Sequence, residues 1–191
     1  MHQIHSIIAY VLLLVLSATT CLASDSAVDI RLDVKEFQLE SGMLFLVVER
    51  PATPQVAVRL AIRAGSALEE TCRTGIAHLL EHMMFKGTEN LKPGEFSEII
   101  AANGGSENAF TSRDYTAYFQ RIAKDRLEIC LKLEADRMRN VVFLSPEFKK
   151  ELAVVQEERR WRVDSNPKRQ LFEQFYATAF LTSPVRIPTI G

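Results

Sequence analysis

Residues 75–85 read Gly-Ile-Ala-His-Leu-Leu-Glu-His-Met-Met-Phe and carry the most informative spacing in the chain. His78 and His82 stand four residues apart, so on a helix they project from one face, one turn apart. Two imidazoles placed in this way can share one zinc ion, with each nitrogen about 2.0–2.1 Å from the metal. Glu81 would then lie near enough to a zinc-bound water to act as a base without being a ligand. The pattern H-x-x-E-H reverses the commoner order H-E-x-x-H and contains the same residues, two histidines and one glutamate.

The same two histidines could instead be helix residues satisfied by local hydrogen bonds. The count of histidines weakens that alternative, because the other two, His2 and His5, both precede residue 23. A catalytic zinc takes three protein ligands, so the third must be a carboxylate or a cysteine. Three acids fall on a helix predicted over residues 147–162: Glu151, Glu157 and Glu158. Glu151 and Glu158 share a helix face and Glu157 does not, but spacing alone leaves solvated charges as an equal alternative.

Three blocks resemble the pitrilysin or insulinase-like zinc metallopeptidases, the inverted-motif class that includes mitochondrial processing peptidases. They are GIAHLLEHMMFKGT at 75–88, NGGSENAFTSRDYTAY at 103–118 and ELAVVQEERR at 151–160. The resemblance implies one Zn²⁺ per chain, held by His78, His82 and Glu158, with Glu81 as the catalytic base. It implies that Glu151, seven residues before Glu158, supports the site, and that Asn108 and Ala109 on an edge strand contact the substrate.

Periodicity predicts an α+β fold in which helices pack on a largely antiparallel sheet, as in the N-terminal domain of that family. The expected strands cover 36–40, 43–49, 55–64, 108–112 and 115–121, and the first two form a hairpin at Ser41-Gly42. The expected helices cover 74–86, 95–103, 123–139, 146–162 and a segment after Pro167. Thr74 is expected to cap the first helix. In the helix over 123–139, Leu127, Leu131 and Met138 are expected on one side and Cys130 in the core.

The N-terminal residues are predicted to direct export. An unbroken apolar run over residues 7–16 and small residues up to Ala23 predict a signal peptide at 1–23, hence a periplasmic protein. An uncleaved membrane anchor is the alternative, and it is the only expected membrane contact. Residues 24–191 then form the zinc-binding peptidase domain, which the resemblance implies to be incomplete at its C-terminus. The sequence leaves open whether Cys72 and Cys130 form a disulfide.

The expected function is that of a zinc metalloendopeptidase acting on peptides or unfolded segments outside the cytoplasm. The charges, 23 basic against 24 acidic side chains, give no electrostatic reason to expect nucleic acid as a partner. The resemblance also implies a homologous C-terminal domain or partner subunit that completes the substrate chamber. The alternative is an inactive fragment or a peptide-binding subunit that needs a separate partner domain.

Overall fold

The first compact unit of the protein ends at Pro51 and contains one β-hairpin. The computed structural model describes residues 32–70 and 72–191, so the predicted signal peptide lies outside the described residues. Strands β1 (Val34–Gln38) and β2 (Leu44–Val48) pair antiparallel, and Phe37 stacks on Phe45 with ring centroids 4.7 Å apart. The hairpin predicted at Ser41-Gly42 is confirmed. None of the described helices combines the length and the apolar character needed to span a membrane.

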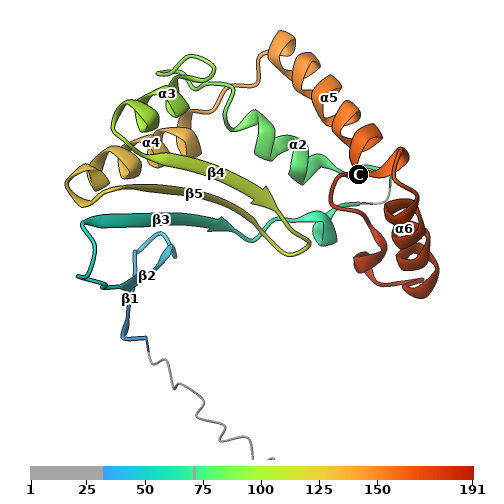
Figure 1. The fold of residues 1–191 in the computed structure, drawn as a ribbon, viewed down its shortest axis with the longest axis horizontal. Helices are drawn as coiled ribbons and strands as arrows, with labels where there is room; N and C mark the ends of the chain where they lie inside the picture. The colour runs from blue at the N-terminus through green and yellow to red at the C-terminus, as the bar shows by residue number, and fades with distance from the viewer. Residues whose placement is uncertain (1–31, 71) are drawn as a thin grey trace, which may run out of the picture. The chain divides into compact units, whose positions relative to one another are not determined.

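The second unit, residues 52–191, is built on a three-stranded antiparallel sheet. Its strands are β3 (Gln55–Ile62), β4 (Ser106–Thr111) and β5 (Thr116–Ala123), in the order β3-β5-β4 (Figure 1). Residues of β3 alternate between half-buried and exposed, as the sequence predicts for a strand with one covered face. Because β5 is central, β4 is an outer strand, with one edge unpaired among the described residues.

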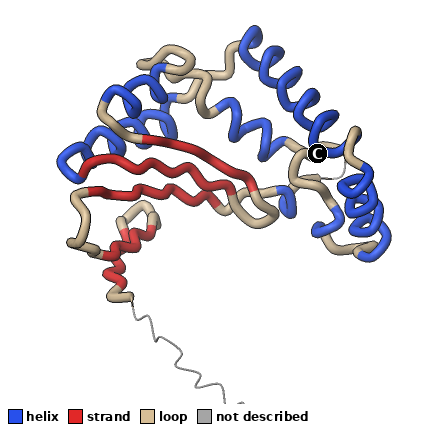
Figure 2. Tube along the Cα trace, viewed as in Figure 1, coloured by secondary structure: helices blue, strands red, loops and turns tan. Residues whose placement is uncertain are grey.

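Helices α2–α5 lie on one side of this sheet, and α6 lies beyond its end (Figure 2). Their bounds are Ile76–Met83 for α2, Glu95–Ala102 for α3, Leu127–Asn140 for α4, Ser145–Arg159 for α5 and Pro167–Ala179 for α6. A π-helical turn, Arg160–Asp164, continues α5, and short 3₁₀ turns cover Ser66–Leu68, Lys124–Arg126 and Pro184–Arg186. The predicted α+β fold, with helices packed on an antiparallel sheet, is confirmed.

The side of α4 that is buried differs from the side that the sequence predicts. Cys130 is fully buried in the core, as expected, where it joins side chains of α3 and β5. However, Leu131 is 45% exposed and Met138 is 40% exposed. The face that turns inward consists of Cys130, Leu133, Glu134 and Arg137, and the two charged residues on it, Glu134 and Arg137, are only 6% and 0% exposed. The prediction was wrong because two charged side chains neutralise each other inside the unit.

Arg137 is the central member of this buried group. Its guanidinium carbon lies 4.3 Å from the ring centroid of Tyr118, 4.4 Å from that of Phe96 and 4.9 Å from that of Phe85. Its Nη2 donates to Glu134, which also accepts a hydrogen bond from Gln120 on β5. Cation–π contacts of this kind are strongest when the cation is removed from water. Arg137 thus ties α4 to β5, to α3 and to the chain just after α2.

Helix α2 begins in a way that the sequence does not predict. Gly75 occupies the N-cap position with φ +85°, a left-handed conformation that glycine adopts without strain. The prediction that Thr74 caps the helix was wrong, because Thr74 lies one residue before the N-cap position. The carboxylate of Glu69 takes that role, because it accepts hydrogen bonds from the amides of Gly75 at 2.8 Å and Ala77 at 2.7 Å. A negative charge there also matches the positive end of the helix dipole.

Glu69→Ala is expected to lower the free energy of unfolding by about 1–2 kcal/mol, the range for loss of a helix N-cap. Urea denaturation followed by circular dichroism would measure it. Glu70→Ala is a matched control, because Glu70 is exposed and makes only a 3.8 Å ion pair with Arg73. Equal losses from the two variants would show that Glu69 does not cap α2.

Candidate metal centre

Three side chains from two helices converge at the end of the sheet near β4. His78 and His82 come from α2, and Glu158 comes from the last turn of α5. Glu158 Oε2 lies 3.7 Å from Nε2 of His78 and 3.5 Å from Nε2 of His82. One ligand atom from each of the three residues lies within 4.8 Å of the other two. The structure therefore brings together the three residues that the resemblance implies as ligands.

The chemistry of this donor set fits a zinc ion. The distances between the imidazole nitrogens and Glu158 are too long for good hydrogen bonds, so the three groups converge without satisfying one another. Burial lowers the pKa of His78, partly offset by Glu158, and this favours the neutral imidazole that a metal binds. Two histidine nitrogens and one carboxylate form a set of three ligands typical of catalytic zinc, with a further position left for water.

Glu151 lies behind one of these histidines. It is buried, with its Oε2 3.2 Å from Nδ1 of His82 and its Oε1 2.7 Å from Nζ of Lys86. A carboxylate beside Nδ1 favours the tautomer that leaves Nε2 free to bind metal. The geometry thus suits Glu151 to the supporting role that the resemblance implies. Glu157 points away, as its spacing indicates, and its side chain is 69% exposed and paired with Arg160.

Glu81 lies beside the cluster and is not one of its three members. Its Oε2 accepts a 2.5 Å hydrogen bond from Oγ1 of Thr111, the last residue of β4. Burial raises the pKa of Glu81, and the bond from Thr111 acts in the opposite direction. A half-buried carboxylate with a raised pKa is a suitable proton acceptor and donor near neutral pH. Thr111 also fixes this carboxylate to the outer strand of the sheet.

Asn108 and Ala109 lie farther along the same strand. Pairing places Asn108 opposite Phe119 and Thr111 opposite Thr116, so Asn108 and Thr111 project from opposite faces of β4. Asn108 is exposed, and its Oδ1 accepts a 2.8 Å hydrogen bond from the amide of Ala109. The Asn108 side chain is therefore on the face of β4 opposite to that of Thr111, which contacts Glu81. Contact of Asn108 and Ala109 with a substrate remains a prediction that concerns the edge of β4.

Three residues of the centre were missed from the sequence: Thr111, Lys86 and Arg162. Arg162 Nη1 lies 2.7 Å from Oε1 of Glu158, the oxygen that faces away from the histidines. Lys86 and Arg162 each stand four residues after a residue of the centre, His82 and Glu158 respectively. That helical spacing was the available signal for both. No spacing in the sequence indicates Thr111, because its contact with Glu81 depends on how the sheet meets α2.

Comparison with known proteins gives a consistent result. Residues 44–191 match the family model described as insulinase, peptidase family M16. The chain is 41% identical over 139 residues to "Zinc protease PqqE" of Helicobacter pylori, covering 73% of this chain and 31% of that protein. It is 33% identical over 154 residues to an uncharacterized zinc protease of Rickettsia bellii, covering 81% of this chain and 37% of that protein.

A solved structure is similar as well. The crystal structure of a protease from Helicobacter pylori superposes with a TM-score of 0.81 at 37% sequence identity, over 84% of this chain and 39% of that one. The chain spans about a third of the length of the curated relatives it matches. Both the sequence match and the fold therefore place the chain in the insulinase family of peptidases, peptidase family M16.

Proposed function

We propose that this chain carries the zinc site of a metalloendopeptidase that hydrolyses peptides or unfolded protein segments. The observation that carries the proposal is the convergence of His78, His82 and Glu158, with Glu81 of α2 beside them and hydrogen-bonded to Thr111 on the outer strand of the sheet. These three residues would hold one zinc ion per chain. Relatives named as zinc proteases support the choice of metal.

Zinc, when bound, supplies a Lewis acid that polarises the scissile carbonyl and makes water acidic enough to be deprotonated near neutral pH. Glu81 accepts the proton of the attacking water and delivers it to the nitrogen of the leaving amine. The hydrogen bond from Thr111 keeps one oxygen of Glu81 in place, so its other oxygen is free for this transfer. Glu151 keeps His82 oriented throughout by contacting its Nδ1.

The outer edge of β4 is the proposed place for the substrate. An extended peptide can add to an open sheet edge through main-chain hydrogen bonds that do not depend on its sequence. The amide of Ala109 donates a hydrogen bond to the neighbouring Asn108 side chain, and it could donate to a carbonyl of the peptide instead. Such a peptide would run past Thr111 and so past Glu81.

The location of the protein and the part of the enzyme that covers the site are also proposals. We infer that residues 24–191 act as the zinc-binding domain of an exported, periplasmic enzyme whose signal peptide is residues 1–23. A homologous domain or partner subunit would cover the substrate, since the M16 relatives are about three times as long as the matched region. A peptide-binding subunit without activity of its own is the second candidate, favoured by the same difference in length.

Glu81→Gln should retain zinc and lose about 10²–10⁴-fold in the rate of hydrolysis, the contribution of a general base. Zinc content would be measured by native mass spectrometry, and hydrolysis with an internally quenched peptide and the zinc-loaded chain. Glu89→Gln, an exposed substitution of the same kind, serves as the control. A Glu81→Gln variant as active as the wild type would rule out Glu81 as base. A wild-type chain that binds zinc and peptide without cleavage would support the peptide-binding subunit.

A further inference from the structure

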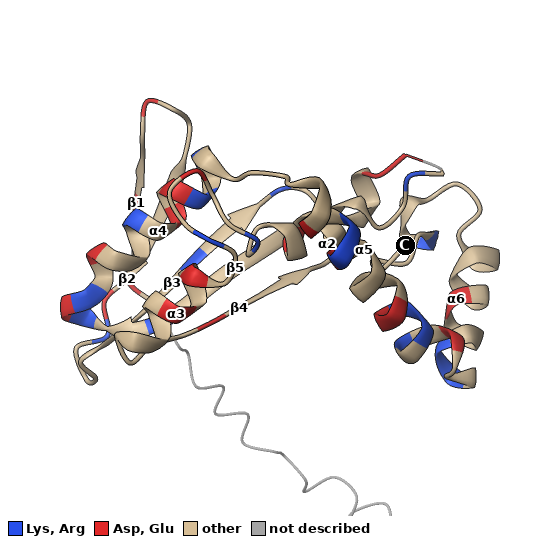
Figure 3. Cartoon of the chain, turned by 90° about the horizontal axis from the view of Figure 1, so that it is seen from above, with Lys and Arg blue, Asp and Glu red and all other residues tan. Residues whose placement is uncertain are grey.

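An open hollow of about 790 Å³ lies beside the metal centre, at the end of the second unit that holds α6. It is bounded by the turn between β4 and β5, the π-helical turn after α5, helix α6 and residues 185–190. Arginines and aromatic side chains make up much of its lining. The arginines are Arg113, Arg162, Arg169 and Arg186, and the aromatic residues are Trp161, Phe172 and Tyr176. Figure 3 shows basic residues on the elements at this end of the unit.

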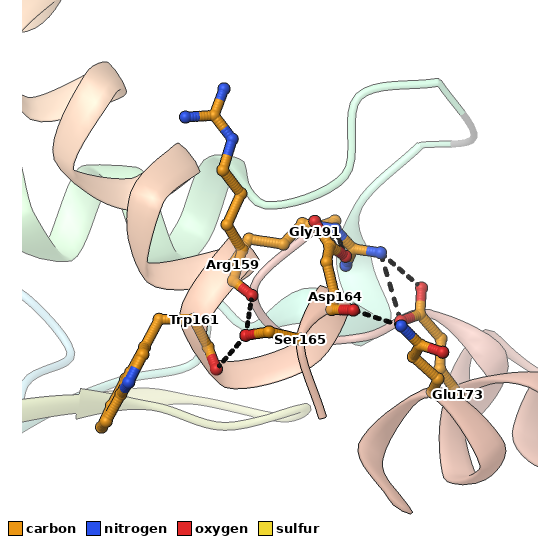
Figure 4. A network of polar contacts seen from close by, with 8 residues as sticks. Arg159, Trp161, Asp164, Ser165, Glu173 and Gly191 are labelled. Carbon is orange, nitrogen blue, oxygen red and sulfur yellow. Dashed lines mark hydrogen bonds and ion pairs between the residues drawn. The ribbon is translucent and has the colours of Figure 1, made fainter. Parts of the chain in front are cut away.

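Most of the positive charge in the hollow is unpaired. Within residues 32–70 and 72–191, no carboxylate lies within 4.0 Å of the guanidinium nitrogens of Arg113, Arg169 or Arg186. Glu173 is the one acid in the lining, and it is held from outside by Arg159, at 2.8 and 3.1 Å (Figure 4). Arg162 is neutralised by Glu158. The hollow therefore presents three arginines without a counter-charge.

Two of its residues connect the hollow to the proposed reaction site. Arg162 lines it and pairs with Oε1 of Glu158, while Oε2 of the same carboxylate faces both histidines. Arg113 follows the last residue of β4, Thr111, by only two positions. A peptide laid along the edge of β4 would thus pass Glu81 and continue toward Arg113.

The guanidinium of Arg113 is already positioned toward this hollow. Its Nε donates a 3.3 Å hydrogen bond to the carbonyl of Val185, and its Cζ lies 4.9 Å from the ring centroid of Tyr176. A guanidinium fixed through Nε and one ring face keeps its two terminal nitrogens available. That fork matches the two oxygens of a carboxylate.

We propose that this hollow is a specificity subsite for an acidic side chain, aspartate or glutamate, of the peptide substrate. The proposal rests on the proposed function, because it takes the substrate to lie along β4. Arg113, Arg169 and Arg186 would bind the carboxylate, and Trp161 and Phe172 would pack against the aliphatic part of the side chain. A lysine or arginine at the same substrate position would be repelled.

The only tryptophan of the chain, Trp161, lies in the hollow and is 75% exposed, so its fluorescence reports on binding there. The zinc-loaded chain would be titrated with three alanine hexapeptides, blocked at both ends, that carry one central Glu, Gln or Lys. The Glu peptide should bind at least about 10-fold more tightly than the Gln peptide, in line with charge-assisted hydrogen bonds, and the Lys peptide most weakly. Mass spectrometry after each titration would show whether the peptide was cleaved.

The double variant Arg169→Gln/Arg186→Gln should lose that preference while zinc content is unchanged. Arg139→Gln is the control, since Arg139 is exposed on α4 and outside the hollow. Equal binding of the Glu and Gln peptides, or binding of none of the three, would overturn the subsite. Acid-selective binding without cleavage would count against the peptidase and leave the subsite standing. Cleavage of all three peptides without preference would support the peptidase and count against the subsite.

Discussion

Glu158→Gln should weaken zinc binding by more than about 100-fold, a larger loss than that expected for a residue outside the ligand set. The substitution removes the only negative charge among the three converging groups, on the carboxylate whose Oε2 lies 3.7 and 3.5 Å from Nε2 of His78 and of His82. Competition with a chromogenic chelator would measure the affinity. All chains would carry Cys72→Ser, because Cys72 is an exposed free thiol that could bind zinc on its own.

Two neighbouring glutamates on α5 provide the comparison. Glu151→Gln should lower the affinity by about 10–100-fold, because Glu151 acts on the metal only through His82. Glu157→Gln should leave the affinity unchanged, because its side chain is 69% exposed and pairs with Arg160. An affinity that falls for Glu157→Gln and not for Glu158→Gln would show that Glu157, and not Glu158, is the third ligand.

Arg137→Met should lower the free energy of unfolding by about 3–5 kcal/mol, the cost of leaving one member of a buried ion pair without its partner. Arg137 is 0% exposed, and Glu134, which it contacts, is 6% exposed. Three aromatic contacts of the guanidinium are lost at the same time. Urea denaturation of the wild type and the variant would measure the difference. A loss of this size takes up a large part of the stability of an ordinary domain.

The double variant Arg137→Met/Glu134→Gln separates the cost of the unpaired charge from that of the lost aromatic contacts. It removes the unpaired charge as well, so it should be more stable than Arg137→Met alone. Arg139→Met is the control on the same helix, since Arg139 is exposed. If Arg137→Met and Arg139→Met had equal effects, the buried pair would contribute nothing measurable to the fold.

The parts of the protein that short-range patterns specify were predicted from the sequence. The spacing of His78 and His82 places both on α2, and the alternation in 55–62 places one face of β3 against the helices. Glu158 was selected by resemblance, and helical spacing did separate it from Glu157. These features depend on the spacing of residues within two turns of a helix or within one strand, so they can be predicted from the sequence alone.

The features that were missed depend on contacts between distant segments. Glu134 and Arg137 look like surface charges on a helix until Phe85, Phe96 and Tyr118 are brought around them. Glu69 caps α2 only because Gly75 turns the chain back toward it. In each case the local sequence favoured a simpler structure, with Glu134 and Arg137 on the surface and Thr74 as the helix cap. Contacts between distant segments stabilise a different one.

The open edge of β4 has a consequence for how the protein behaves at high concentration. An unpaired strand edge accepts any extended chain, including the same strand of another molecule, and so promotes aggregation. Proline and lysine, which commonly block such pairing, are both missing from β4 (Ser106–Thr111), where Glu107 is the one charged residue. If substrate adds to this edge, as we propose, the edge cannot be blocked without loss of function. Solubility and peptide capture would then oppose each other on this strand, and a peptide bound there would also protect the protein from self-association.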